Sequence, residues 1–286
     1  MVNHMRRTYI QMTNLLKISL VCVLLSLNSY ASKIVSVGGS ITETIVALGH
    51  SDELIGVDLS SVYPKEVTSK LPNVGYWLSL PQEGILSLKP EIAIISSQAA
   101  PEKVVEALPN FGIKTYIIDD KPSLESAKRK IAQVGEILGE NQKAKEIISR
   151  IENNVSKIQK ELKGKEKKKI LFVFSRGKGT MMAAGPKTKP GVMINLAGGT
   201  NVLEFPQYTK ISAESILEMN PDVIIKTNHA GDSGLSDEIV ASTNAGKNKQ
   251  IYEMDMSYIS GFTVRIDQAL EELTCMFNDN KLTYCK

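Results

Sequence analysis

The chain repeats one phrase, EGILSLKPEIAII at residues 83–95 and ESILEMNPDVII at residues 214–225. Each copy begins with an acid, continues as an amphipathic turn, and places Pro and a second acid before an apolar run. The interval from Glu83 to Glu214 equals the interval from Pro90 to Pro221. A solenoid unit is only about 20–50 residues long, so this repeat predicts two similar domains. Ligands commonly bind in clefts between domains, which makes ligand binding the first hypothesis.

Strands alternate with helices around both copies. A β-branched run at 33–37 meets Gly38-Gly39, and a helix is expected over 41–48 with Ser40 and Glu43 as its capping box. Further strands are expected at 54–57, 92–95, 114–118, 170–174, 223–226 and 250–254. This alternation predicts an α/β fold of two Rossmann-like lobes with mostly parallel sheets.

One long helix is expected to join the lobes. Apolar residues recur at helical spacing over 141–163 without any Pro, and such a helix would extend about 35 Å at 1.5 Å per residue. The expected organisation is a signal peptide over 1–31, an N-terminal lobe over 32–140, the linking helix over 141–163 and a C-terminal lobe over 164–286.

The first residues have the pattern of a cleaved export signal. Arg6, Arg7 and Lys17 precede a short apolar core, and Ser29-Tyr30-Ala31 supplies small residues for cleavage. The apolar run is shorter than the roughly 20 residues that span a bilayer. A lipoprotein would use Cys22, but the apolar run continues past it. We therefore expect a periplasmic protein.

Charge and motif content exclude several function classes. The chain has 34 Lys and Arg against 31 Asp and Glu, and three of the basic residues fall in the leader, so the remainder is balanced. Nucleic-acid binding calls for a basic face and is not expected. Gly38-Gly39-Ser40 and Gly177-x-Gly179 match no phosphate loop and indicate tight turns. Only His50 and His229 follow the leader, so no enzyme activity is expected.

Two cysteines lie close to the C-terminus. In an exported protein an isolated pair such as Cys275 and Cys285 can form a disulfide that pins the last helix to the tail. The alternative is a pair of free thiols. Their spacing matches no metal-ligand pattern.

Three segments carry a family resemblance. They are IVSVGGSITE at 34–43, NVGY at 73–76 followed by EGILSLKP at 83–90, and MAAG at 182–185. Together they resemble periplasmic haem-binding proteins of ABC haem importers. These belong to the helix-linked (class III) periplasmic substrate-binding proteins, which also bind siderophores and cobalamin.

The resemblance implies a ligand set. Tyr76 matches the family's axial ligand to ferric haem b, the transported cargo, and a phenolate ligand to haem iron has precedent. This chain has Leu78 where many relatives have Arg, and Arg176 where some have a His ligand. Arg176 is expected to pair with a haem propionate or the phenolate, with a solvated loop charge as the alternative for Arg176 and Lys178. His229 is a candidate second ligand, with an exposed loop position as the alternative. Further cargo contacts are expected from Trp77, Lys178, Met181, Met182 and Tyr258.

The resemblance also implies partners. Glu83 and Glu214 match the acids that dock each lobe onto an inner-membrane ABC permease dimer with its ATPase, although each acid would also favour a helix N-terminus. A haem donor such as an outer-membrane receptor is expected upstream, and the protein is expected to be a monomer. The alternatives are the same fold carrying a ferric siderophore or cobalamin, an exported haem- or metal-dependent enzyme, and an interaction module without a small ligand.

Overall fold

The computed structural model describes residues 32–99, 101–175, 180–227, 237–279 and 281–285. The expected leader over 1–31 and the candidates Arg176, Lys178 and His229 lie outside these ranges. In the described part of the chain, none of the helices has the length and apolar character needed to cross a membrane.

The first lobe is built on a four-stranded parallel sheet in the order β2-β1-β3-β4. Its strands are β1 (Ile34–Val37), β2 (Leu54–Val57), β3 (Ile92–Ser96) and β4 (Lys114–Ile118). Its helices are α2 (Gly39–Leu48), α3 (Lys65–Thr68), α4 (Gln82–Leu86) and α5 (Glu102–Ala107), with 3-10 turns at Ser51–Glu53 and Leu108–Phe111. The apolar alternation therefore predicted these four strands correctly, each to within a residue at either end.

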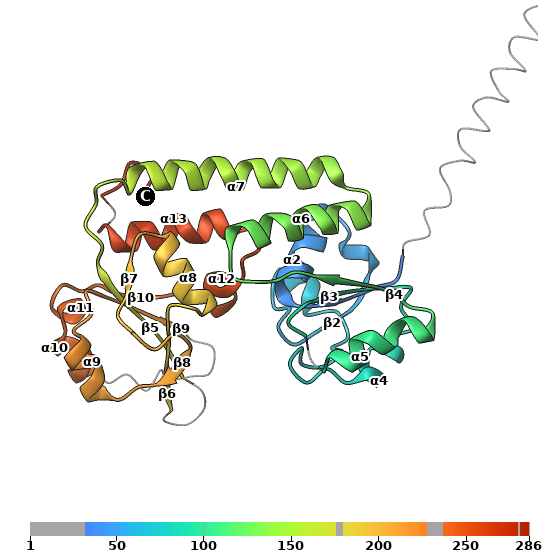
Figure 1. Ribbon diagram of the computed structural model, residues 1–286, viewed down its shortest axis with the longest axis horizontal. Coiled ribbons are helices and arrows are strands. Elements are labelled where there is room, and N and C mark those ends of the chain that lie inside the picture. The colour runs from blue at the N-terminus through green and yellow to red at the C-terminus, as the bar shows by residue number, and fades with distance from the viewer. Residues whose placement is uncertain (1–31, 100, 176–179, 228–236, 280, 286) are drawn as a thin grey trace, which may run out of the picture. The chain divides into compact units, whose positions relative to one another are not determined.

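Two long helices follow the first sheet. α6 (Leu124–Leu138) begins at a Ser123 side-chain cap and ends at left-handed Gly139, and α7 (Asn141–Glu161) packs against it. Figure 1 shows α7 lying along α6 and then along α13 (Ile266–Phe277), the last helix of the chain. One apolar cluster continues from Ile34 and Ile41 of the first lobe through Ile151 and Val155 of α7 to Phe172 of the second lobe. The linking helix is thus part of a shared core.

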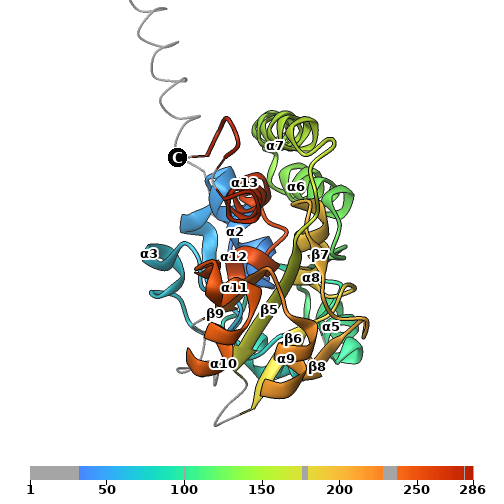
Figure 2. The same ribbon diagram turned by 90° about the vertical axis from the view of Figure 1, so that its left-hand side faces the viewer.

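The second lobe has a mixed sheet in the order β10-β9-β5-β6-β8, with β7 also paired to β5. Figure 2 shows β5 between β9 and β6. The strands are β5 (Lys169–Ser175), β6 (Met181–Ala184), β7 (Thr200–Asn201), β8 (Tyr208–Lys210), β9 (Val223–Thr227) and β10 (Ile251–Glu253). The remaining helices are α8 (Lys189–Leu196), α9 (Ala213–Met219), α10 (Asp237–Ser242), α11 (Asn244–Lys247) and α12 (Met256–Ser260). The two-lobed α/β fold is confirmed, with antiparallel β6 and β8 added to the parallel strands.

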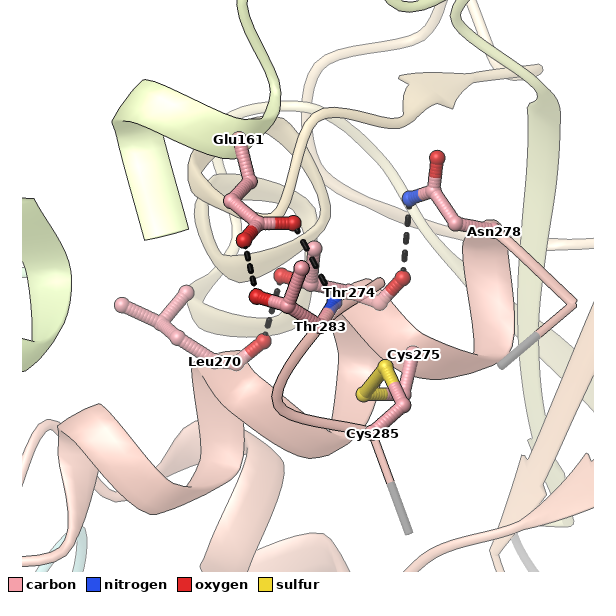
Figure 3. Close-up of a disulfide and its surroundings, with 7 residues drawn as sticks. All are labelled: Glu161, Leu270, Thr274, Cys275, Asn278, Thr283 and Cys285. Atoms are coloured by element: carbon pink, nitrogen blue, oxygen red, sulfur yellow. Dashed lines mark hydrogen bonds between the residues drawn. A yellow bond between two sulfur atoms is a disulfide. The ribbon is translucent and has the colours of Figure 1, made fainter. Parts of the chain in front are cut away.

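A disulfide joins Cys275 of α13 to Cys285 of the tail, with a Cα–Cα distance of 5.6 Å (Figure 3). In the same tail, the backbone N–H of Thr283 donates to Glu161 at the end of α7 at 3.3 Å, and the Thr283 hydroxyl donates to the same carboxylate. The tail is therefore attached to both α13 and the linking helix.

Candidate functional site

The two copies of the repeated phrase place one acid at the start of a helix in each lobe. Glu83 lies in the first turn of α4 and Glu214 in the first turn of α9, and both side chains are exposed. The hydrogen bond with the Ser212 side chain lowers the pKa of Glu214. Each carboxylate is therefore available to a partner.

The loop that carries Tyr76 is held in a defined turn. Gly75 has φ 117°, its N–H donates to Asn73 Oδ1 at 2.8 Å, and a Cβ there would meet Pro81 Cδ at 2.3 Å. Only glycine fits this position. The Ser79 N–H then donates to the Tyr76 carbonyl at 2.9 Å. Together these contacts present the phenol of Tyr76, which is 42% exposed.

Exposed apolar side chains gather on two neighbouring loops of the first lobe. The loops touch where the Leu59 N–H donates to the Gly75 carbonyl at 2.9 Å. We call this set the apolar rim; its members are Leu59, Val62, Tyr63, Tyr76 and Leu78. Exposed apolar side chains on neighbouring loops can contribute to a binding site. An Arg at position 78 would have brought charge into this rim; here the position is apolar.

The other expected cargo contacts are more buried than Tyr76. Trp77 packs against the core of the first lobe, with its ring 5.9 Å from that of Tyr76. Met181 and Met182 of β6 are only 9% and 8% exposed, and Met181 packs in the core of the second lobe. Tyr258 of α12 is half-buried against Arg265, and burial raises the pKa of Tyr258 to about 12. Tyr76 is therefore the most exposed aromatic among these expected contacts.

The Gly38-Gly39 turn is held by hydrogen bonds to side chains of the first lobe. The Gly38 N–H donates to Asp58 Oδ1 at 2.8 Å and the Gly39 N–H donates to Ser60 Oγ at 3.0 Å. Because a carboxylate of the chain already occupies this turn, it offers no place for a phosphate. The prediction of a tight turn is confirmed for Gly38-Gly39, whereas Gly177 and Gly179 lie outside the described residues.

The expected capping box at Ser40 and Glu43 is wrong. α2 begins at Gly39, behind Gly38 with φ 113°, and has no side-chain cap. Ser40 Oγ instead donates to Asp120 Oδ1 at 2.9 Å, and Glu43 pairs with Arg265. Tertiary partners therefore take both side chains away from the helix end.

Asp120, which follows β4, is the centre of a buried charge cluster. It pairs with Lys130 of α6 and, at 3.1 Å, with Lys189 of α8, and it also accepts from Ser40 and Ser96. Burial by itself disfavours the charged carboxylate, but Lys130 and Lys189 outweigh it and lower the pKa of Asp120 to about 2. Asp120 is therefore charged in any neutral environment.

A second ion pair lies on the next turn of α2. Both oxygens of Glu43 accept from the Arg265 guanidinium at 2.8 Å. The same guanidinium lies 3.6 Å from the ring centroid of Tyr63 and 4.8 Å from that of Tyr258, within cation–π range. Only 3% of the Glu43 side chain is exposed, so this is a partly buried, bidentate pair.

The sequence did not predict a role for Asp120, Lys130, Lys189 or Arg265. Lys130 carried a signal, because it falls on the apolar stripe of α6 with Ala127, Ile131 and Val134, and a buried Lys requires an acidic partner. Which acid supplies it depends on how the chain packs. The described residues contain no group of three or more His, Cys, Asp or Glu able to hold a metal ion.

The chain is similar in sequence to a known protein family and to several of its members. Residues 34–258 match the family model described as periplasmic binding protein. Among curated relatives, an uncharacterised ABC transporter substrate-binding lipoprotein of Bacillus subtilis (strain 168) is 27% identical over 252 residues, covering 84% of this chain and 78% of the relative. A vitamin B12-binding protein of Vibrio parahaemolyticus serotype O3:K6 is 25% identical over 257 residues, covering 89% and 92%.

A solved structure gives the same assignment. The periplasmic heme-binding protein RhuT from Roseiflexus sp. RS-1, in apo form, superposes with a TM-score of 0.78 at 33% identity. The match covers 87% of this chain and 98% of RhuT. The two-lobed α/β fold agrees with this comparison. The chain belongs to the periplasmic binding protein family, as a non-enzymatic substrate-binding protein of an ABC importer.

Proposed function

We propose that the protein captures ferric haem b in the periplasm and delivers it to an inner-membrane ABC permease. The observation that carries this proposal is the exposed Tyr76, which lies on a constrained turn in the apolar rim. A hard anionic oxygen donor suits ferric iron, and the surrounding apolar side chains suit a flat hydrophobic macrocycle. The haem-binding protein RhuT is more similar in sequence to this chain than the vitamin B12-binding relative is.

Tyr76 is the proposed axial ligand. Its turn is constrained by Gly75 on one side and by the Ser79 hydrogen bond on the other, so the backbone that carries the phenol is already in place. A single axial ligand leaves the opposite face of the iron open, which suits a carrier that must release its cargo. Further cargo contacts are proposed from Trp77, Met181, Met182 and Tyr258, and from Arg176, Lys178 and His229 outside the described residues.

The proposed partners follow from Glu83 and Glu214. One exposed acid at an equivalent place on each lobe fits a permease with two-fold symmetry, because each half of the permease can contact one carboxylate. A cleaved leader over 1–31 and a haem donor such as an outer-membrane receptor complete the proposed route. Cargo passes from donor to binding protein and then to the permease with its ATPase.

The test is a haemin titration followed by absorption spectroscopy. Wild-type protein should give a saturable ferric high-spin spectrum. Tyr76→Phe keeps the ring and removes only the oxygen, so haemin affinity should fall by at least about 100-fold, since even indirect metal-ligand contacts are worth 10–100-fold. Tyr63→Phe is the matched control on the same rim and should bind as wild type. Equal affinity in both variants would exclude Tyr76 as the ligand.

Cobalamin is the second candidate cargo, and the 25% identical vitamin B12-binding relative supports it. Cobalamin needs no phenolate donor from the protein, so its binding should survive Tyr76→Phe. A titration with cyanocobalamin therefore separates the two proposals. Saturable binding of cyanocobalamin, with no spectral response to haemin, would show that the cargo is cobalamin and not haem. If the protein binds neither haemin nor cyanocobalamin, a ferric siderophore becomes the next candidate cargo.

A further inference from the structure

We propose that two ion pairs at the first turns of α2 brace the lobes against each other and set the angle between them. The pairs are Asp120–Lys189 and Glu43–Arg265, and we call them the lobe brace. In each pair the acid belongs to the first lobe and the base to the second. This role goes beyond cargo binding.

Both pairs converge on one short stretch of α2. Ser40 donates to Asp120 at 2.9 Å, and Glu43, three residues further along the helix, binds Arg265. α2 itself is fastened to the first lobe by Thr42, whose hydroxyl lies 2.8 Å from that of Ser36 and 2.7 Å from that of Ser61. The start of α2 therefore moves only with the first lobe, and any lobe rotation must strain the brace.

On the second lobe the two bases are also fixed in place. Lys189 is the first residue of α8, directly behind the Thr188 cap that accepts from the Gly191 N–H at 3.1 Å. Arg265 precedes α13, and its guanidinium lies over Tyr63 of the first lobe as well as Tyr258 of the second. Arg265 thus contacts the first lobe through an ion pair and an aromatic ring.

The physical need for such a brace comes from the linkage. The linking helix and the shared core join the lobes along α7, so contacts away from that line add resistance to bending and twisting about it. Exposed ion pairs are too weak for this task, but Glu43 and Asp120 are both more than nine-tenths buried. Pairs so buried are screened little by salt.

The brace also has a consequence that rests on the proposed function. A fixed lobe angle keeps a constant spacing between Glu83 on α4 and Glu214 on α9. A permease with two receiving sites would then meet the same pair of carboxylates on loaded and empty protein. The permease would then have to distinguish loaded from empty protein through the cargo itself or through the loops that surround the cargo.

The test measures the distance between the lobes without any cargo. Spin labels at Lys103→Cys of α5 and Glu218→Cys of α9, both exposed positions, report one distance distribution in a chain that also carries Cys22→Ser and keeps its native disulfide. Pulsed electron spin resonance is recorded for this parent chain, for Lys189→Gln, for Glu43→Gln and for the double variant. Lys189→Gln leaves Asp120 its contacts with Lys130, Ser40 and Ser96, so that variant should remain folded.

The matched control is Arg129→Gln. Arg129 of α6 pairs with Asp119 at 2.9 Å, beside Asp120, but both partners belong to the first lobe. The expected result is a broader distribution for each single brace variant, a still broader one for the double variant, and no change for Arg129→Gln. If the double variant keeps the width of the parent chain, the brace is excluded. Failure to bind haemin would leave this measurement unaffected, because no cargo is present.

Discussion

The two copies of the repeated phrase fold alike but are stabilised differently. In the first lobe, α4 begins behind Pro81 without a side-chain cap. In the second lobe, α9 begins with a reciprocal capping box between Ser212 and Ser215. The repeat therefore specifies the backbone path and the exposed acid in each lobe, while local contacts at the helix start have diverged.

The ends of the two copies show the same contrast. Each helix is followed by a left-handed residue and then Pro, with φ 50° at Lys89 and 42° at Asn220. Asn tolerates this conformation better than Lys. Asn220 Oδ1 also accepts from the Asn244 N–H at 2.8 Å, so the second copy is better matched to its own turn.

The largest expected effect is on haemin uptake by cells, and it tests whether Glu83 and Glu214 are equivalent. Glu83→Lys and Glu214→Lys should each lower haemin uptake by cells about tenfold or more, because a reversed charge opposes a basic docking site at a cost of several kcal/mol. Haemin affinity of the purified variants should remain that of wild type. Glu218→Lys, on the same helix as Glu214, is the control. Unequal losses would show that only one lobe carries the docking contact, and unchanged uptake would remove both acids from docking.

The disulfide distinguishes the second lobe from the first. Replacing Cys275 and Cys285 by Ser should destabilise the fold by about 3 kcal/mol, from the loop-closure entropy of a loop of about ten residues. Urea unfolding followed by circular dichroism measures this loss. The fluorescence of Trp77, the only Trp, reports the first lobe. Coincident transitions would show that the shared core makes the lobes unfold together, whereas a lag at Trp77 would show that they unfold separately.

The buried charge at Asp120 makes the first lobe sensitive to acid. The pKa of Asp120 is lowered from 3.8 to about 2 in the folded chain, so the charged carboxylate stabilises the fold at any pH above about 4. This contribution of about 2 kcal/mol is lost as the pH falls from about 4 to 2. Urea midpoints measured across that range should fall for wild type and fall less for Asp120→Asn. Parallel curves would contradict the assignment.

The smallest expected effect concerns the left-handed residues. Lys89→Gly should stabilise the fold by about 0.5–1 kcal/mol, because glycine adopts a positive φ without steric cost. Asn220→Ala should destabilise it by about 1–2 kcal/mol, since Ala has neither that tolerance nor the contact with Asn244. Thermal unfolding of both variants measures the difference. A loss of stability in Lys89→Gly would show that its side chain has a role beyond the turn.

The sequence predicted the fold well, and the site residues it indicated stay predictions. Alternation of apolar runs located the parallel strands because buried strands leave a local pattern. Antiparallel β6 and β8 are short, and their pairing with each other joins residues distant in sequence. The local pattern of residues 181–184 and 208–210 therefore did not predict these strands. The capping box at Ser40 failed for a similar reason, since its local pattern was outweighed by Asp120 and Arg265, which are distant in sequence.

By itself, the sequence determined the two lobes, the linking helix and the two exposed acids, because repeats and periodicities are written into consecutive residues. It also marked the Gly75-Tyr76 turn, where a glycine is required by the backbone. Only the tertiary structure decided which charges meet. Glu43 and Arg265 are separated by most of the chain, and the whole linking helix lies between Asp120 and Lys189 in the sequence. Such pairs depend on the packing of whole lobes, which no local stretch of residues specifies.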